Sequence, residues 1–385
     1  MLYLDYFQEL QKTLHEQGNG QPQLILDLSK LEQNIDWLQH KMPTHLKPRL
    51  VVKSLANSIL LKRIAKAFNT QSFMVFHLPH AVHILQAYTQ ADILMGKPVP
   101  LQCLKSFIED QAEHLPKVQW LIDSAERLKN YLTYAKERNL QLRINLEIDI
   151  GLHRGGLSDL EQFMHCLAII KSHSEYLSLS GLMGYDAHVS KLPSALFSPI
   201  QSYQKSQQCY MNFINVMCQM LPELDLSALC LNGAGSGTLH HHFIQTVCND
   251  VSFGSMLLKP TDFDLEGLEP MQPALWIAAP VLKVLDQIQL PGLERLKRFQ
   301  PRQRAVCIYG GYWRGKCIYP PGTKPHLLYG RSSNQELLQI PSGCRIQVDD
   351  YVFFRPAQSE SILPQFASLY AYEQGQYQKW ENFRE

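Results

Sequence analysis

The feature that most constrains this chain is a regular alternation of short apolar stretches with amphipathic ones between residues 49 and 256. The apolar stretches are almost continuous runs, as expected for parallel strands that are covered on both faces. They span residues 49–54, 72–76, 91–96, 118–123, 142–149, 179–185, 229–234 and 250–256. Eight strands in this alternation predict an α/β fold, a (β/α)8 TIM-type barrel, with a doubly wound open sheet as the alternative.

The stretches between these strands have helical spacing. Apolar side chains fall at i, i+3, i+4 and i+7 in residues 61–68, 128–135, 163–170 and 210–217. Such stripes predict helices that pack one face against a sheet. A further strand is expected at residues 24–28, and the capping-box pattern Ser29-x-x-Glu32 predicts the start of the helix that follows it.

The pattern changes after about residue 270, where helical spacing fades and turn signals such as Pro320-Pro321-Gly322 appear. Short strands are predicted within residues 278–289, 304–311, 344–356 and 368–380. The chain is therefore divided into three parts. Residues 1–23 form an N-terminal segment that packs with the β domain, residues 24–270 form the barrel, and residues 271–385 form a mostly antiparallel β domain.

Composition and charge exclude several classes of function. The net charge is +1, so no electrostatic field directs the chain to nucleic acid or to an anionic membrane. The basic run at residues 295–304 is short, contains a proline and is interpreted as a solvated connection. The nine cysteines include no C-x-x-C pair, and no signal peptide or apolar run of about 18 residues is present. We expect reduced thiols and a cytoplasmic protein.

Polar residues collect where the predicted strands end, which is the active-site face of a (β/α)8 barrel. The segment 233–238, GAGSGT, follows the seventh strand, and Gly254-Ser255 belongs to the eighth. Glycines let backbone N–H groups approach an anion, and the loops after strands seven and eight are the usual phosphate site of this barrel. The residues at the other strand ends are Lys53, Glu147, Asp149, His153, Arg154, Tyr185, Asp186 and His188.

Lys53 ends the first strand, where burial is expected to be high. A lysine there can extend its charge into water or pair with a carboxylate. A desolvated lysine instead has a depressed pKa and can form a Schiff base with a carbonyl. A lysine of that kind opposite a phosphate-binding turn predicts pyridoxal 5'-phosphate (PLP) as the cofactor.

Five segments of the chain resemble, in order and spacing, the fold-type III PLP proteins, in particular D-threonine aldolase and D-serine dehydratase, with alanine racemase more distant. These segments are VVKSLANSILLKRIA, NLEIDIGLHRGGL, GLMGYDAHV, NGAGSGT and DVSFGSMLLKP. The resemblance covers about residues 24–262 and implies an alanine racemase-like barrel with Lys53 as the Schiff-base lysine. It also implies catalytic roles for Tyr185 and His188, although His188 could equally be a polar residue at a helix start. The cofactor-binding residues that it implies are Lys53, Arg154, Tyr185, Gly235, Ser236, Gly237, Thr238, Gly254 and Ser255.

The tail departs from the metal-using members of this family. Gln358 stands where they carry a histidine, and Glu360 where they carry cysteine or aspartate. An amide and a carboxylate are a poor pair for zinc, so we assign no metal ligand and expect no zinc-dependent reaction. Glu360 can instead bind a substrate amine or hydroxyl, and residues 332–336 can add to the same wall. The three histidines 240–242 are interpreted as surface residues, because neighbours on a helix point apart.

The resemblance implies a PLP-dependent enzyme that acts on a D-amino acid through an external aldimine. The leading expectation is an aldolase-like lyase on a D-3-hydroxy amino acid. A racemase or epimerase and a D-serine dehydratase-like deaminase are the alternatives, and a non-catalytic PLP carrier is the alternative from another class. The expected partner is a small-molecule substrate, with no nucleic acid and no membrane, and relatives suggest a homodimer.

Overall fold

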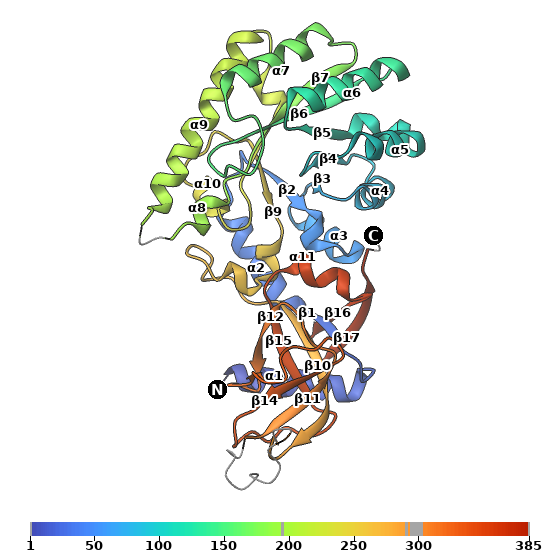
Figure 1. Cartoon of the computed structure of the whole chain (residues 1–385), viewed down its shortest axis with the longest axis vertical. Helices are drawn as coiled ribbons and strands as arrows, with labels where there is room; N and C mark the ends of the chain where they lie inside the picture. The colour runs from blue at the N-terminus through green and yellow to red at the C-terminus, as the bar shows by residue number, and fades with distance from the viewer. Residues whose placement is uncertain (1, 194–195, 289–291, 293–302, 384–385) are drawn as a thin grey trace.

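The computed structural model describes residues 2–193, 196–288, 292 and 303–383. Its upper body in Figure 1 is a closed barrel of eight parallel strands in sequential order. The strands are β2 (Lys47–Val51), β3 (Ser72–Val75), β4 (Asp92–Met95), β5 (Val118–Ile122), β6 (Leu142–Ile148), β7 (Leu177–Gly184), β8 (Cys230–Gly233) and β9 (Asp250–Phe253). β9 pairs with β2 and closes the barrel, so the predicted barrel is confirmed and the open sheet is not formed.

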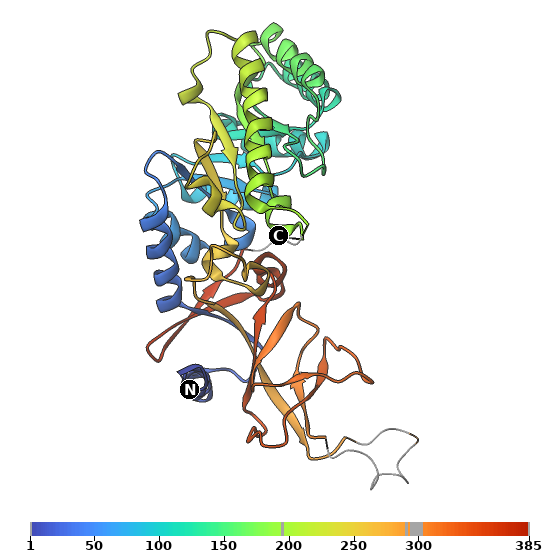
Figure 2. The ribbon, with the colours of Figure 1, turned by 90° about the vertical axis from the view of Figure 1, so that its left-hand side faces the viewer.

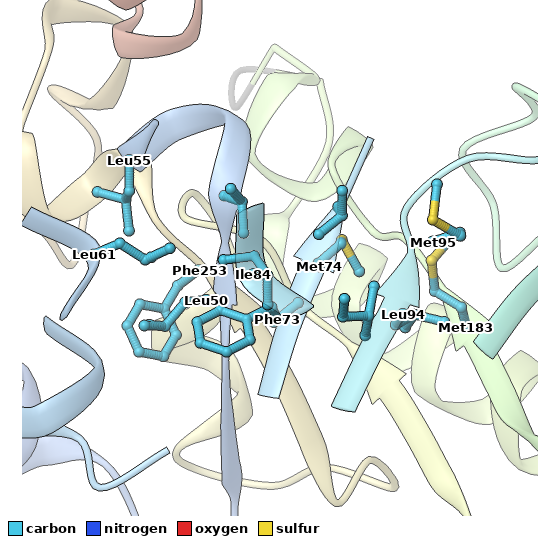
Figure 3. Close-up of a cluster of buried hydrophobic side chains, with 14 of the residues drawn as sticks. Leu50, Leu55, Leu61, Phe73, Met74, Ile84, Leu94, Met95, Met183 and Phe253 are labelled. Carbon is cyan, nitrogen blue, oxygen red and sulfur yellow. The ribbon is translucent and has the colours of Figure 1, made fainter. Parts of the chain in front are cut away.

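Helices cover the outside of the barrel and include all four that the apolar stripes predict. Leu61, Ile64 and Ala65 are buried on one face of the helix after β2. Figure 3 shows Leu61 beside Leu50 and Phe253 in the layer between helix and barrel. The helices of the barrel are α3 (Ser58–Ala67), α4 (Leu78–Ala87), α5 (Leu101–Gln111), α6 (Ala125–Arg138), α7 (Leu160–Ser172), α8 (His188–Lys191), α9 (Pro199–Met220) and α10 (Leu239–His242).

The strand expected at residues 24–28 and the helix after it both form, as β1 (Gln23–Asp27) and α2 (Leu28–Lys41). β1 hydrogen-bonds with strands of the second sheet and not with the barrel, so the barrel strands begin only at β2. The helix α2 does not start at the predicted capping box. Asp27 is its N-cap and accepts a hydrogen bond from the backbone of Lys30. An aspartate in extended backbone directly before the helix caps it well, so Ser29 lies inside the first turn.

Among the described residues, the lower body is a sheet of nine strands in which only β1 and β16 pair in parallel. Its other strands are β10 (Leu275–Leu285), β11 (Ala305–Tyr309), β12 (Gly315–Tyr319), β13 (Lys324–Pro325), β14 (Gln335–Gln339), β15 (Tyr351–Pro356), β16 (Ser368–Glu373) and β17 (Gln376–Glu381). The mostly antiparallel β region is thus confirmed. Three of its strands, β12 to β14, were not predicted, and the stretch 344–356 is strand only from Tyr351 onward. Most of the basic run at 295–304 lies outside the described residues.

The N-terminal helix α1 (Leu2–Gln17) packs on this sheet, with Phe7 against Trp276 and Phe353 at ring-centroid distances of 5.0 and 4.9 Å. In Figures 1 and 2 the two bodies lie one above the other, and the short helix α11 (Ser359–Ile362) lies between them. α11 contacts the 3-10 turn η1 (Val52–Leu55) after β2 and the turn η4 (Ser255–Leu258) after β9. The second sheet therefore delivers residues to the carboxyl-terminal end of the barrel. Within the described residues, no helix has the length and apolarity that a membrane span requires.

Candidate active site

A cavity of about 390 Å3 opens at the carboxyl-terminal ends of the barrel strands, which is within the size range of small-molecule sites. Both bodies contribute to its wall. Its charged lining residues are Lys53, Arg154, Lys191, Asp262, Arg314 and Glu360. Cations outnumber carboxylates in this wall by two, so the cavity favours an anionic ligand.

Lys53 lies in η1, two residues beyond the end of β2, and its side chain enters the cavity. The ammonium nitrogen lies 4.2 Å from the centroid of the Phe76 ring. Burial lowers the pKa of Lys53, the Glu360 carboxylate raises it, and the cations Arg154, Lys97 and Lys191 lower it further. The net pKa lies below the usual lysine value, which favours the neutral amine that a Schiff base requires.

The glycine turn, residues 233–238, forms another part of the wall. The backbone N–H groups of Thr238 and Leu239 both donate to the carbonyl of Gly235, at 3.0 Å each, and this closes the turn. Among the described residues, the N–H groups of Gly235, Ser236 and Gly237 have no acceptor. Three free donors in succession beside a cavity form an anion-binding concavity.

Side chains crowd the turn and explain its glycines. A Cβ atom on Gly235 would lie 2.7 Å from the Tyr185 ring, and one on Gly237 would lie 2.9 Å from the Ser190 hydroxyl. The Ser236 hydroxyl accepts hydrogen bonds from the backbone of Gly254 and Met256, at 3.1 and 3.2 Å. These bonds fix the turn against the end of β9, so the two predicted phosphate-binding segments lie side by side.

Glu360 reaches the cavity from α11, and three hydroxyl groups surround its carboxylate. The hydroxyls of Ser54, Ser255 and Ser359 lie 3.4, 3.2 and 3.4 Å from Oε2. The Ser255 and Ser359 hydroxyls also share a 2.6 Å hydrogen bond, so one of these two donates to the other and at most two of the three donate to the carboxylate at once. The Ser255 hydroxyl is thus directed to α11 and not to the glycine turn. Gln358, two residues before Glu360, has a different partner: its amide oxygen accepts a hydrogen bond from Arg314 at 2.9 Å. Within the described residues no group of three or more His, Cys, Asp or Glu side chains could hold a metal ion.

Arg154 and Tyr185 both line the cavity, with the guanidinium carbon 5.2 Å from the centroid of the tyrosine ring. Burial raises the pKa of Tyr185, and the carboxylates of Asp186 and Glu360 raise it further against the opposing effect of Arg154. The phenol is therefore protonated at neutral pH and able to donate a hydrogen bond into the cavity.

His188 lies elsewhere. It does not line the cavity, and its Nε2 atom lies 3.2 Å from the hydroxyl of Ser206 on α9. A Cβ atom on Gly151 would meet the same ring at 3.0 Å, so the imidazole fills the space between α9 and the loop after β6. The catalytic role that the resemblance implies for His188 stays a prediction, without a contact in this cavity.

Sequence reasoning missed several residues of the site. Arg314, Lys191 and Asp262 line the cavity, and each lies in a segment with no strand-end signal. The interpretation of the three histidines as surface residues is wrong for His242, which is 2% exposed. Its Nε2 atom lies 2.9 Å from the buried carboxylate of Asp186. Only the spacing of an acid after β7 and a histidine after β8 could have indicated this pair, because neighbouring barrel strands end close together.

Comparison with known proteins identifies the class. Residues 26–262 match the family model of the alanine racemase N-terminal domain. The chain belongs to this family, whose members are fold-type III PLP proteins.

Individual relatives differ in activity. An alanine racemase of Streptococcus equi subsp. zooepidemicus is 23% identical over 272 residues, which cover 69% of this chain and 67% of the relative. The solved structure of D-threonine aldolase from Filomicrobium marinum superposes with a TM-score of 0.73 at 15% identity, over 93% of this chain and 94% of the other. D-threo-3-hydroxyaspartate dehydratase from Delftia sp. HT23 gives a TM-score of 0.68 at 17% identity, over 94% and 97%. These structural matches establish the fold, and the activity has to be argued from the site.

Proposed function

We propose that this chain is a PLP-dependent enzyme of the cytoplasm that acts as a homodimer on a D-amino acid. The observation that carries the proposal is the placement of a half-buried lysine with a lowered pKa in the same cavity as three free backbone donors. These residues fit the cofactor. Lys53 would hold its aldehyde carbon, the turn at Gly235–Gly237 with Ser236 its phosphate, and Arg154 with Tyr185 its ring.

PLP, when bound, supplies an electron sink for a carbanion at the α-carbon of an amino acid. The residues of this chain decide which bond at that carbon is broken. Tyr185 offers a protonated phenol, and Glu360 offers a carboxylate that lies within hydrogen-bond distance of three serine hydroxyls. A 3-hydroxyl group on a substrate has the same chemistry as the serine hydroxyls that Glu360 binds.

This environment favours an aldolase-like lyase that acts on a D-3-hydroxy amino acid. Glu360 would accept the proton of the 3-hydroxyl group as the C3–O bond becomes a carbonyl. The bond between the α-carbon and C3 would break with its electron pair left on the α-carbon, which then takes up a proton to give the shorter amino acid. A carboxylate in this position replaces the metal ion that metal-using relatives place there. The reaction is therefore expected to proceed without zinc.

Racemase and dehydratase reactions use the same cavity and differ in breaking the bond between the α-carbon and its hydrogen. The alanine racemase relative supports the racemase reaction as the second candidate. A non-catalytic PLP carrier is less well supported, since Arg314, Gln358 and Glu360 from the second sheet region line the cavity beyond the cofactor-holding residues.

The test is an assay of the purified, PLP-loaded protein with D-threonine, D-serine and D-alanine, each with Mn2+ and with a chelator. Formation of glycine and acetaldehyde from D-threonine, unchanged by the chelator and lost in Glu360→Gln, would support the proposal. Gln358→Ala serves as the matched control, because Gln358 lines the same wall without a carboxylate. Pyruvate from D-serine or L-alanine from D-alanine would identify the alternatives, and a yellow protein that converts none of the three would indicate a carrier.

A further inference from the structure

A chain of buried polar side chains lies directly behind the glycine turn. The Thr238 hydroxyl donates to Oδ1 of Asp186 at 2.6 Å, and His242 Nε2 lies 2.9 Å from Oδ2 of the same carboxylate. Asp186, Thr238 and His242 are 0%, 1% and 2% exposed. None of the three faces bulk water, so their contacts are set by the fold alone.

The direction of the hydrogen bond from Thr238 follows from the charge of Asp186. Burial raises the pKa of Asp186, but the hydrogen bonds from His242 and Thr238 outweigh burial and leave the pKa below its usual value. An ionised carboxylate accepts hydrogen bonds and donates none. The single hydroxyl proton of Thr238 is therefore committed to Asp186.

This commitment changes the role of Thr238. Its backbone N–H already donates to the Gly235 carbonyl, so Thr238 has neither of its donors free for a phosphate group. The donors that remain are the backbone N–H groups of Gly235 to Gly237 and the proton of the Ser236 hydroxyl. Thr238 instead fixes the end of the turn whose other residues present those donors.

The pair of Asp186 and His242 is itself held in place. His242 Nδ1 lies 2.8 Å from the Thr246 hydroxyl, which in turn contacts Oε1 of Gln207 on α9 at 3.2 Å. Tyr185, the neighbour of Asp186, faces the opposite side and lines the cavity. The end of β7 thus contributes one side chain to the cavity and the next one to the support of the turn.

We propose that Asp186 and His242 are positioning residues that fix the anion-binding form of the glycine turn through Thr238 and so give the cavity its preference for a phosphorylated cofactor. The inference rests on the proposed function, because PLP is the phosphorylated ligand. It assigns selectivity for phosphate to residues that do not touch the cofactor.

The experiment measures the affinity of the apoprotein for PLP and for pyridoxal, which has the same aldehyde and ring but no phosphate. Thr238→Val removes the hydroxyl with little change of shape, and Thr238→Ser retains it. We expect Thr238→Val to lower the affinity for PLP about 10-fold, the equivalent of one charge-assisted hydrogen bond, and to leave the affinity for pyridoxal within about twofold of the native value. Thr238→Ser is expected to stay near the native affinity for both ligands.

A second pair of variants tests the support behind Thr238 and decides the question even if Thr238→Val does not fold. His242→Leu removes the partner of Asp186, whereas His241→Leu changes its half-buried neighbour, which stacks on Tyr203 at 5.2 Å. We expect only His242→Leu to lose PLP affinity selectively over pyridoxal. Inorganic phosphate should compete with PLP in the native apoprotein and less effectively in His242→Leu.

The outcomes separate the two proposals. Suppose that the native chain binds PLP. If Thr238→Val and His242→Leu lower the affinities for PLP and pyridoxal equally, or lower neither affinity, the positioning role is overturned and the proposed function stands. If the native chain does not bind PLP, the proposed function itself is overturned.

Discussion

Two cations four residues apart, Arg49 within the first barrel strand and Lys53 two residues beyond its carboxyl-terminal end, lie in opposite electrostatic situations. Arg49 is 1% exposed and binds Asp250 through Nε at 2.7 Å and through Nη2 at 2.9 Å, with Asp92 at 2.7 Å. Burial lowers the pKa of Arg49, but Asp250, Cys230 and Asp92 outweigh burial and raise it. Lys53 has no carboxylate within ion-pair distance among the described residues, and its pKa is lowered.

The difference shows how one barrel separates stability from chemistry. At the amino-terminal ends of β4 and β9, the Arg49 guanidinium with its five fixed donors joins the partly exposed Asp92 to the buried Asp250. At the carboxyl-terminal end, an amine that can lose its proton stands in a cavity beside the glycine turn. The two ends should therefore respond in opposite ways to mutation.

The largest expected effect is on activity and concerns Lys53. Lys53→Met should lose the visible absorbance of the PLP-loaded protein and all turnover, because it removes the amine that we propose holds the aldehyde, and Lys191 in the same cavity wall should not replace it. Burial already disfavours the charge at this position, so the free energy of unfolding should not fall. Absorbance spectra and urea unfolding test both parts. Lys53→Arg, which keeps the charge but cannot attach the cofactor, should be equally colourless.

The next effect is on stability and concerns Arg49. Arg49→Met leaves the buried carboxylate of Asp250 without a cation, whereas the partly exposed Asp92 keeps Arg143, so we expect a loss of about 3–5 kcal/mol in the free energy of unfolding. Arg49→Lys should recover only part of the loss, because one ammonium cannot replace the forked contacts. A variant as stable as the native chain in urea unfolding would contradict the assignment of this cluster to stability.

The smallest effect is a shift in pH dependence. Only the neutral amine of Lys53 reacts with an aldehyde, so the rate of PLP attachment to apoprotein should rise with pH, with a midpoint below the ordinary lysine pKa of 10.5. Glu360 raises the pKa of Lys53 and Lys97 lowers it. Glu360→Gln should therefore move the midpoint to lower pH, and Lys97→Met should move it to higher pH. Stopped-flow absorbance measures both, and shifts in the same direction would show that these charges do not act on Lys53.

The sequence predicted the barrel end of the site far better than the second sheet's contribution. Lys53 and the glycine turn could be recognised because each directly follows an apolar strand. In a barrel the carboxyl-terminal ends of the strands lie close together, so residues with this local pattern come together in the fold. The surroundings of Glu360 carry no such signal. Ser54 and Glu360 meet across 306 residues, and Thr238 and Asp186 across 52. Contacts of this kind depend on the packing of whole elements, as do the unpredicted strands β12 to β14 and the orientation of His188 toward α9.

Borohydride reduction of the PLP-loaded protein, followed by proteolysis and mass spectrometry, tests the central claim most directly. Reduction makes the bond between the lysine amine and the cofactor permanent, so the modified peptide identifies the lysine. We predict one stoichiometric phosphopyridoxyl group on the peptide that contains Lys53, and none when inorganic phosphate in excess has displaced the cofactor before reduction. A modification spread over exposed lysines, or located on Lys191 with Lys53 unmodified, would contradict the account.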